Sequence, residues 1–258
     1  MGSRSIAVVV TTIAFMTQAG ATRAAEIKVL SSHAININEA YVEFTAMFEK
    51  ASDHRVTTTF TTGWAGTPEI TKRLQGGEMY DLVIGSRQLI DDMIKEGRLL
   101  AGNRVDLAKS GVGVAVRAGA PKPDIASTEA VKRALLAAKS IGYSTGPSGV
   151  YLVGLIQRLG LADEIKPKLR QTPGPNLLVG DLLARGEAEL GFQQVSELLH
   201  FPGIQYVGPL PADIQETTVF SAALQPGAAQ ADAAKAFIRF ITSPVATPVI
   251  TKSGMEPG

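Results

Sequence analysis

Residues 140–151 have the sequence Ser-Ile-Gly-Tyr-Ser-Thr-Gly-Pro-Ser-Gly-Val-Tyr, and this stretch decides the fold class. Its first part, Ser140 to Tyr143, predicts a short strand, and a helix is expected to open at Gly149. Hydroxyl residues, glycine and proline lie between them, and these residue types favour tight turns. A strand that passes through such a loop into a helix is the repeating unit of α/β proteins, so we expect an α/β fold.

The same alternation of strand and helix continues on both sides of this stretch. Strands are expected near residues 27–30, 55–61, 82–84, 111–117, 190–192, 204–207 and 217–224. Helices are expected near residues 38–51, 68–75, 89–96, 128–138, 177–185, 233–241 and 245–252. Two such sets predict two lobes, each a mostly parallel sheet flanked by helices, with a ligand cleft between them.

The chain is expected to divide into a leader and two lobes. Residues 26–110 form the predicted first lobe and residues 111–209 the second, and a C-terminal segment, about 210–258, returns to the first lobe. In the leader, Arg4 precedes an uncharged apolar stretch, and Ala24 and Ala25 follow as small residues before a possible cleavage site. This order is typical of a secretory signal peptide, so residues 1–25 are predicted to be removed on export to the periplasm.

Composition excludes several classes of function. The 258 residues have a formal net charge of +1, which lacks the basic excess that nucleic-acid binding requires. There is no cysteine, so neither disulfides nor thiolate metal sites can form. The three histidines, His33, His54 and His200, lack metal-ligand spacing, and no nucleotide-binding fingerprint occurs. We therefore expect no metal and no cofactor.

Five loops that follow predicted strands are rich in hydroxyls, glycine or amides. They are residues 31–34, 61–67, 85–87, 143–149 and 191–194. Exposed N–H groups at a helix start, together with hydroxyls, can hold an anion with little formal charge. Since these loops occupy equivalent places in an α/β pattern, they predict a cleft that binds a small anion.

The chain downstream of the leader resembles the periplasmic molybdate-binding family of solute-binding proteins. The matching stretches are residues 27–34, 60–67, 81–86, 147–151 and 186–191, of which Pro147-Ser148-Gly149-Val150-Tyr151 and Gly186-Glu187-Ala188 are the more specific. The resemblance implies the type II periplasmic binding protein architecture, with two lobes, a hinge and a buried oxyanion held by neutral donors.

The residues expected to bind the ligand come from these loops and from alignment with that family. They are Ser31, Ser32, Ala34, Gly66, Thr67, Arg87, Ser148, Gly149, Asn176 and Gln194. Several depart from the family pattern: Ala34 replaces a serine, Asn176 a valine, and Gln194 a tyrosine that reaches molybdate. The amides and the nearby Arg87 suit planar carboxylates better than a tetrahedral oxyanion.

A periplasmic enzyme family, the aconitate isomerases, shares this general sequence type. The resemblance and the departures together favour an enzyme that interconverts trans- and cis-aconitate, or a tricarboxylate-binding relative. The alternative is a receptor without catalysis, which would deliver molybdate or another small anion to an ABC permease. Either way the expected partner is a small organic anion or an oxyanion, with no nucleic acid, and the chain is expected to be a monomer.

An isomerase of this kind must remove a proton from one carbon and return one to another. His33 is the candidate base because its ordinary pKa lies near working pH. Tyr143 and Tyr151 are alternative proton donors. The competing interpretations are a capping or surface histidine and two tyrosines that only pack in the core.

Overall fold

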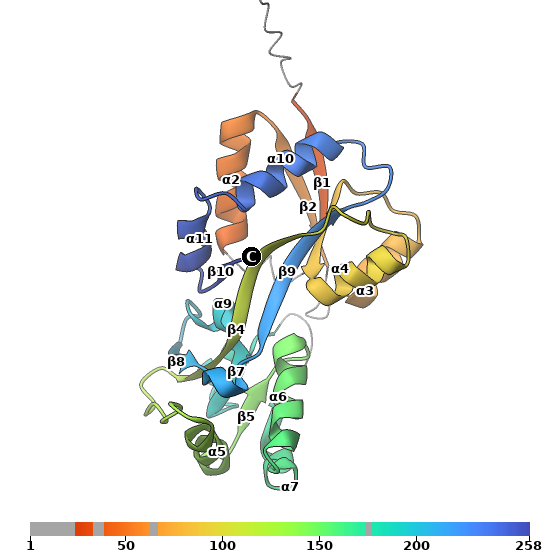
Figure 1. Cartoon of the computed structure of the whole chain (residues 1–258). Coiled ribbons are helices and arrows are strands. Elements are labelled where there is room, and N and C mark those ends of the chain that lie inside the picture. Colours follow the sequence, from red (N-terminus) through yellow and green to blue (C-terminus); the bar gives the residue numbers. More distant parts are fainter. Residues whose placement is uncertain (1–23, 33–38, 62–66, 174–176) are drawn as a thin grey trace, which may run out of the picture.

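The structure is a computed structural model that describes residues 24–32, 39–61, 67–173 and 177–258. Its helices and strands gather into an upper and a lower lobe joined by long strands (Figure 1). The leader, residues 1–25, falls almost wholly outside the described residues, so the signal peptide stays a prediction. Among the described helices, none is long and apolar enough to cross a bilayer.

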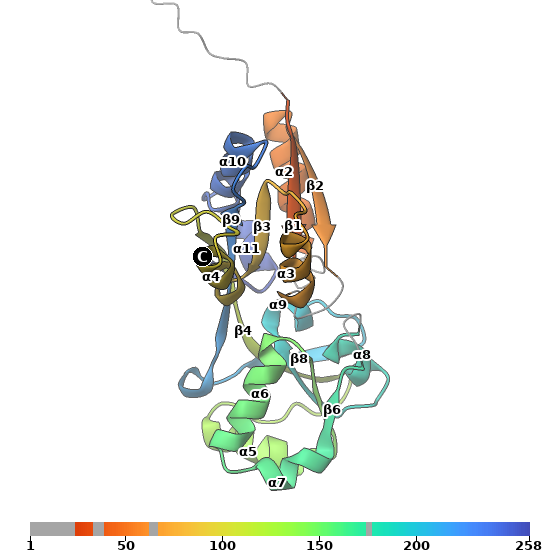
Figure 2. The same ribbon diagram turned by 90° about the vertical axis from the view of Figure 1, so that its right-hand side faces the viewer.

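The sheet of the upper lobe has the strand order β2-β1-β3-β9-β4. Its strands are β1 (Glu26–Ser31), β2 (Arg55–Phe60), β3 (Leu82–Ser86), β4 (Val105–Arg117) and β9 (Thr217–Leu224), with the short β10 (Glu256–Pro257) paired to β4. Strand β1 is parallel to β2 and β3. The carboxyl ends of these three strands therefore share one edge, which faces the lower lobe (Figure 2).

The sheet of the lower lobe has the order β4-β7-β5-β6, and β8 also pairs with β4. Its further strands are β5 (Ile141–Tyr143), β6 (Leu169–Gln171), β7 (Leu190–Gln194) and β8 (Ile204–Pro209). Strand β7 is antiparallel to β4 and parallel to β5, so the carboxyl ends of β5 and β7 point back toward the upper lobe. The strand ends of the two lobes thus face each other.

The prediction of mostly parallel sheets needs correction, because both sheets are mixed. Strand β9 is antiparallel to β3 and to β4, and β4 is antiparallel to β7 and β8. The physical reason is that β4 carries the chain down from the upper lobe and β9 carries it back. A strand that returns in this way must run against its neighbours.

Strand β4 belongs to both sheets and is longer than the predicted segment 111–117. Its first part, Val105 to Gly111, pairs with β9, and its second part, Val112 to Val116, pairs with β7. The missed part contains Asp106 and Lys109, whose charges conceal the strand in the sequence. One strand of 13 residues therefore sets the relation between the lobes.

Helices cover both faces of the upper sheet. They are α2 (Glu39–Ser52), α3 (Thr67–Gln75), α4 (Arg87–Lys95), α10 (Ala231–Ile241) and α11 (Thr247–Lys252). One core lies under α2, α10 and α11 and contains the fully buried Phe237. A second core lies under α3 and α4 around Ile70 and Ile90. Pro248 stands in the first turn of α11, where its missing N–H costs no helical hydrogen bond.

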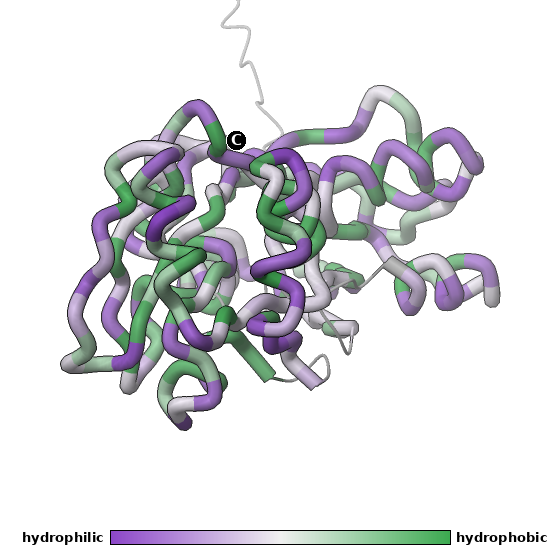
Figure 3. The backbone as a smooth tube through the Cα atoms, turned by 90° about the horizontal axis from the view of Figure 1, so that it is seen from below, coloured by the Kyte–Doolittle hydropathy of each residue, from purple (hydrophilic) through white to green (hydrophobic). Residues whose placement is uncertain are grey.

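The lower sheet is also covered on both faces. Its helices are α5 (Thr128–Ala137), α6 (Pro147–Arg158), α7 (Ala162–Ile165), α8 (Val179–Ala184) and α9 (Val195–Leu198), with 3-10 turns at Lys166–Lys168 and Ala212–Ile214. Phe192 of β7 is fully buried in the core that α5 and α6 cover. Hydrophobic and hydrophilic residues alternate along the helices of both lobes, as expected for helices that cover a core on one side (Figure 3). The lobe boundaries at residues 110 and 209 stay a prediction.

Candidate functional site

A cavity of about 460 Å³ lies where the strand ends of the two lobes face each other. Its lining comes from α4 and the strand ends of the upper lobe, from α6, β7 and α9 of the lower lobe, and from β9 (Figure 1). The lining residues are Ser32, Ser86, Leu89, Thr145, Gly146, Pro147, Ser148, Val150, Tyr151, Gln194, Glu197, Glu216, Thr218 and Phe220. This volume suits a small organic ligand.

Each strand end contributes one polar side chain to this cavity. Ser32 follows β1, Ser86 ends β3, and Gln194 ends β7. Ser86 also caps α4, because its Oγ accepts a hydrogen bond from the backbone N–H of Leu89 at 3.3 Å. The predicted site residue Ser31 is buried one position earlier, and its Oγ donates to the carbonyl oxygen of Ser32 at 3.4 Å.

The loop from Ser144 to Gly149 is tightly folded against the cavity. The Ser144 Oγ accepts from the Gly146 N–H at 3.2 Å and lies 3.4 Å from the Ser148 Oγ. The N–H groups of Gly149 and Val150 both donate to the carbonyl oxygen of Gly146 at 3.0 Å. Gly149 packs so closely that a Cβ atom there would lie 1.8 Å from the Ser144 carbonyl oxygen. The position of the Ser148 hydroxyl at the cavity thus depends on glycine at the next residue, Gly149.

Several buried polar atoms near the strand ends have no hydrogen-bond partner within the part of the chain that the structure describes. They are Ser32 Oγ, Thr61 Oγ1, Thr172 Oγ1, Gln193 Nε2 and both carboxyl oxygens of Glu197. Buried polar groups are normally paired, so such a group needs an explanation of its own. Ser32 and Glu197 line the cavity, and a polar ligand would supply their missing partners.

Glu197 is the most perturbed titratable group of the site. It lies on α9, directly after β7, and is 6% exposed. Burial raises the pKa of its carboxyl group well above the usual range, because the charged form is poorly solvated there. Gln193 and the backbone of Gln194 lie near enough to oppose this rise, but neither makes a hydrogen bond of good geometry to the carboxyl oxygens.

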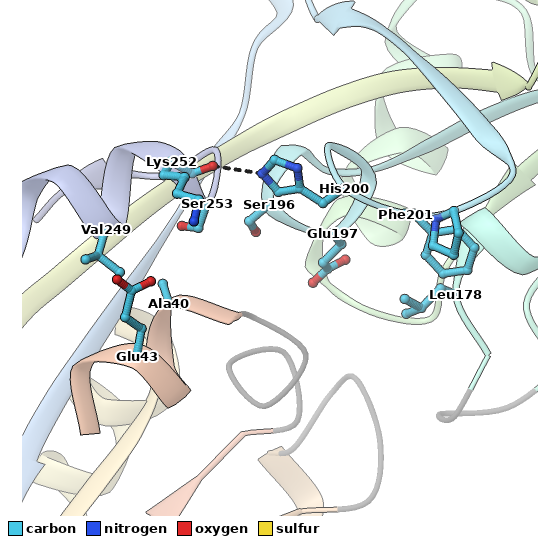
Figure 4. Close-up of a pocket in the computed structure, with 11 residues that line it drawn as sticks. Ala40, Glu43, Leu178, Ser196, Glu197, His200, Phe201, Val249, Lys252 and Ser253 are labelled. Carbon is cyan, nitrogen blue, oxygen red and sulfur yellow. Dashed lines mark hydrogen bonds between the residues drawn. The ribbon is translucent and has the colours of Figure 1, made fainter. Parts of the chain in front are cut away.

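A second cavity, of about 190 Å³, lies on another side of Glu197 (Figure 4). Its lining residues are Ala40, Glu43, Leu178, Ser196, Glu197, His200, Phe201, Pro202, Val249, Lys252 and Ser253. His200 Nε2 is 2.8 Å from the carbonyl oxygen of Lys252 and so links α11 to the segment just after α9. Glu197 is shared by the two cavities.

The amide of Gln194 is used within the protein. In the orientation that satisfies both of its ends, its nitrogen donates to the Ser110 carbonyl oxygen at 2.8 Å and its oxygen accepts from Thr218 Oγ1 at 2.6 Å. These bonds join β7 to β4 and β9. Gln194 therefore lines the cavity while it connects the lobes.

Arg87 lies in an ion pair and outside the described lining of the cavity. Its guanidinium pairs with the Asp106 carboxylate, to which Arg104 Nη1 also donates at 2.7 Å. Burial raises the pKa of Asp106, but hydrogen bonds from Ser221 and Arg87 outweigh it and leave the pKa lowered. The structure thus provides a partner for Arg87 without any ligand.

The two candidate tyrosines lie in different places. Tyr151 lines the cavity, donates to the Ile214 carbonyl oxygen at 2.7 Å, and has the Arg158 guanidinium 5.0 Å from its ring centre. Burial raises the pKa of Tyr151, so its phenol gives up a proton less readily, which disfavours it as the proton donor. Tyr143 packs against the core of the lower lobe and is not among the described residues that line the cavity.

The family follows from the sequence as a whole. The family described as bacterial extracellular solute-binding proteins matches residues 27–256, which is nearly the whole chain. The chain belongs to this family. The predicted recognition is confirmed at this level.

Two relatives of this solute-binding protein indicate how the family has diversified. An aconitate isomerase from Pseudomonas sp. is 37% identical over 217 residues, which cover 83% of this chain and 82% of that protein. The molybdate-binding protein ModA of Azotobacter vinelandii is 27% identical over 241 residues, 91% of each chain. The chain is thus a homologue of an aconitate isomerase and, more distantly, of molybdate-binding proteins.

The solved structures of this family confirm the fold class. The periplasmic molybdate-binding protein of Azotobacter vinelandii superposes with a TM-score of 0.70 at 18% sequence identity, covering 90% of this chain and 99% of that one. At this identity the likeness concerns the fold alone. The predicted two-lobed α/β binding-protein fold is therefore correct.

Several predicted site residues lie outside the described residues. These are His33, Ala34, Gly66 and Asn176, and for Thr67 the backbone begins α3 but the side chain is not described. Of the remaining ones, the structure brings Ser32, Ser148, Tyr151 and Gln194 to one cavity. In the parts of the chain that are described, no group of histidine and carboxylate side chains could hold a metal ion.

Sequence reasoning missed Glu197, Glu216 and Ser86 as cavity residues. Ser86 could have been predicted, because it lies in one of the predicted loops. Glu197 comes two residues after the predicted amides at the end of β7, yet a lone glutamate gives no sign of burial. Only the packing of α9 between the lobes reveals it.

We predict that Gly149→Ala lowers the free energy of unfolding by about 1–3 kcal/mol and weakens ligand binding, because the added methyl group must push the Ser144 carbonyl away. Gly154→Ala is the matched control in the same helix, where the nearest atom to a new Cβ is Arg158 Nη1 at 3.4 Å. That variant should be neutral or more stable by up to about 1 kcal/mol. Urea unfolding of both variants checks the pair, and equal effects would contradict the close contact at Gly149.

We also predict that Glu197 makes stability depend on pH. Its pKa is near 4.5 in the unfolded chain and well above that in the folded one, so the folded state holds a proton that the unfolded state releases. Stability is therefore full below about pH 4.5 and falls by about 1.4 kcal/mol per pH unit as pH rises through the window up to the folded pKa. In Glu197→Gln this contribution should vanish, and unfolding measured between pH 5 and 8 should show a flatter profile. Identical pH profiles in the two proteins would contradict the raised pKa.

Proposed function

We propose that this chain is an exported aconitate isomerase built on the solute-binding fold. The observation that carries the proposal is the 37% identity to an aconitate isomerase across 83% of the chain. A cavity between the lobes that presents several hydroxyl groups and contains a titratable group is consistent with it. Binding requires donors for carboxylates, and the reaction requires a group that exchanges protons.

Neutral donors suit the binding of a tricarboxylate here. Ser32, Thr145 and Ser148 present hydroxyl groups from both lobes to one cavity. Hydrogen bonds to a carboxylate are charge-assisted and are stronger than those between neutral groups. Donors that converge from two lobes would also stabilise the delocalised anion that forms when a proton leaves the substrate.

A receptor function is the second candidate, and one observation favours it. The molybdate-binding relative from Azotobacter vinelandii matches 91% of the chain, a larger share than the isomerase does. A receptor would need an ABC permease as its partner and would bind its anion without converting it. The two functions differ in turnover, which makes them separable by experiment.

We predict that purified protein converts trans-aconitate to cis-aconitate with no added metal or cofactor. The reason is that an allylic proton shift needs only a proton-transfer group and donors for carboxylates. Chromatography of both isomers over time measures the reaction, with heat-denatured protein as the control.

A thermal-shift series with trans-aconitate, citrate and molybdate completes this test. A ligand that binds only the folded protein raises Tm, and at equal concentration the tighter ligand raises it more. Aconitate should raise Tm more than molybdate does. A shift with molybdate alone, without turnover of aconitate, would replace the isomerase by the receptor.

Export is the other part of the proposal. The family is extracellular by description, and the leader has the charge and apolar order of a signal peptide. We predict a mature N-terminus between Thr22 and Glu26, because small residues end there and β1 begins at Glu26. The intact mass of protein from the periplasm checks this, and retention of residues 1–21 would contradict it.

A further inference from the structure

Glu197 combines burial, the absence of a partner and a place on the cavity wall. It is 6% exposed, neither of its carboxyl oxygens has a hydrogen-bond partner among the residues that the structure describes, and it lines both the larger and the smaller cavity. In Figure 4 its carboxyl group points into the smaller cavity, away from His200. A carboxyl group held in this way has both oxygens available to a bound molecule.

The other titratable groups that face these cavities differ from it. They are Glu43 on α2, His200 after α9, Lys252 on α11, Tyr151 on α6 and Glu216 before β9. Glu43 and Glu216 are exposed, His200 lies against the Lys252 carbonyl oxygen, and Tyr151 donates to the Ile214 carbonyl oxygen. Of this described set, Glu197 is the member that is both buried and unpartnered.

A buried carboxyl group without partners is costly for folding, because water no longer solvates it and nothing replaces the lost hydrogen bonds. A hydrophobic residue or a glutamine with paired amide atoms would remove this cost. Such a group is therefore a candidate for function, with its chemistry determined by what enters the cavity.

We propose that the Glu197 carboxyl group moves the proton in the isomerisation, as the base in the first half of the reaction and as the acid in the second. This role rests on the proposed isomerase function. It places the proton transfer on α9 of the lower lobe, whereas the prediction from the loops placed it on His33, which lies outside the described residues.

The proposed step balances with one protein group. The ionised carboxylate removes a proton from the methylene carbon of aconitate, and the electron pair of that C–H bond enters the three-carbon allylic system. The carboxyl group then gives the proton to the carbon that was vinylic in the substrate. The double bond moves by one position, the carboxylate is restored, and no further reactant is consumed.

The environment of Glu197 suits this step. A base is most effective when its pKa lies near the working pH, and glutamates reach that range through burial. Burial raises the pKa of Glu197 in this way. Both oxygens are unpartnered, so one carboxyl group can face two carbons of a planar substrate without breaking bonds to the protein.

The test compares Glu197→Gln with Glu164→Gln. Glutamine keeps the size and the neutral charge of the protonated acid but cannot take or give the proton. We expect Glu197→Gln to bind trans-aconitate within about threefold of wild type by calorimetry, while kcat falls by about 100-fold or more. Glu164→Gln removes an exposed carboxylate from α7, outside the described lining of both cavities, and should leave both quantities within about threefold.

Three outcomes separate the claims. Turnover in Glu197→Gln within about threefold of wild type overturns the role of Glu197 and leaves the isomerase function standing. Wild-type protein that binds aconitate but never converts it overturns the isomerase function, and the role of Glu197 falls with it. Equal loss of binding and turnover in a folded Glu197→Gln variant makes Glu197 a binding residue and also overturns the proposal.

Two further readouts do not depend on how well Glu197→Gln folds. Glu197→Asp keeps the acid but withdraws it by one methylene, so its kcat should fall between those of wild type and the glutamine variant. In wild type, kcat should decrease as pH falls through the raised pKa of Glu197, since the base must be ionised. A wild-type kcat that stays constant down to the ordinary range of a glutamate, near pH 4.5, contradicts the proposal.

Discussion

The antiparallel ladder between β4 and β9 is the constraint on which the rest of this molecule depends. Strand β4 pairs with β9 over Val105 to Gly111 and with β7 over Val112 to Val116, so a single strand belongs to both sheets. This sharing turns the carboxyl ends of β1 and β3 toward those of β5 and β7. Loops at the carboxyl ends of parallel strands are where α/β proteins bind ligands. The cavity is therefore a consequence of how the chain crosses between the lobes.

The polar groups of the site that destabilise the folded protein lie at this crossing, away from the cores that stabilise the lobes. Phe237 and Phe192 are fully buried in separate cores, one in each lobe, and neither lines a cavity. Between these cores lie the unpartnered hydroxyl of Ser32 and the unpartnered carboxyl of Glu197. Each such group costs about 1–3 kcal/mol when nothing pairs with it. The two cores, which contain neither of these groups, offset that cost.

Much of the fold could be predicted because strand, loop and helix leave local signals. Residues 140–151 already show the hydroxyl-rich turn into α6, and Thr217–Leu224 is found as a strand with the predicted limits. The first half of β4 could not be found, since Asp106 and Lys109 interrupt its apolar pattern and the partners of Asp106 come together only in the folded protein. Arg87 looked available for a ligand because its partner Asp106 is 19 positions away in sequence. The burial of Glu197 is a tertiary fact, and no local pattern encodes it.

The same scaffold can hold an anion or convert one, and the difference lies in a few groups on the wall. A receptor gains from a cavity of neutral donors, because an ionisable group facing a bound anion would make affinity vary with pH. An isomerase needs at least one such group, held away from water so that its proton can be exchanged with the substrate. Arg87 does not supply an ionisable group for the ligand, since its charge is already paired with Asp106. Glu197 does provide such an ionisable group, because burial raises its pKa and its charge can then respond to a bound ligand. Under the proposed function, the neutral donors of the loops bind the substrate and a single buried carboxyl group adds the chemistry.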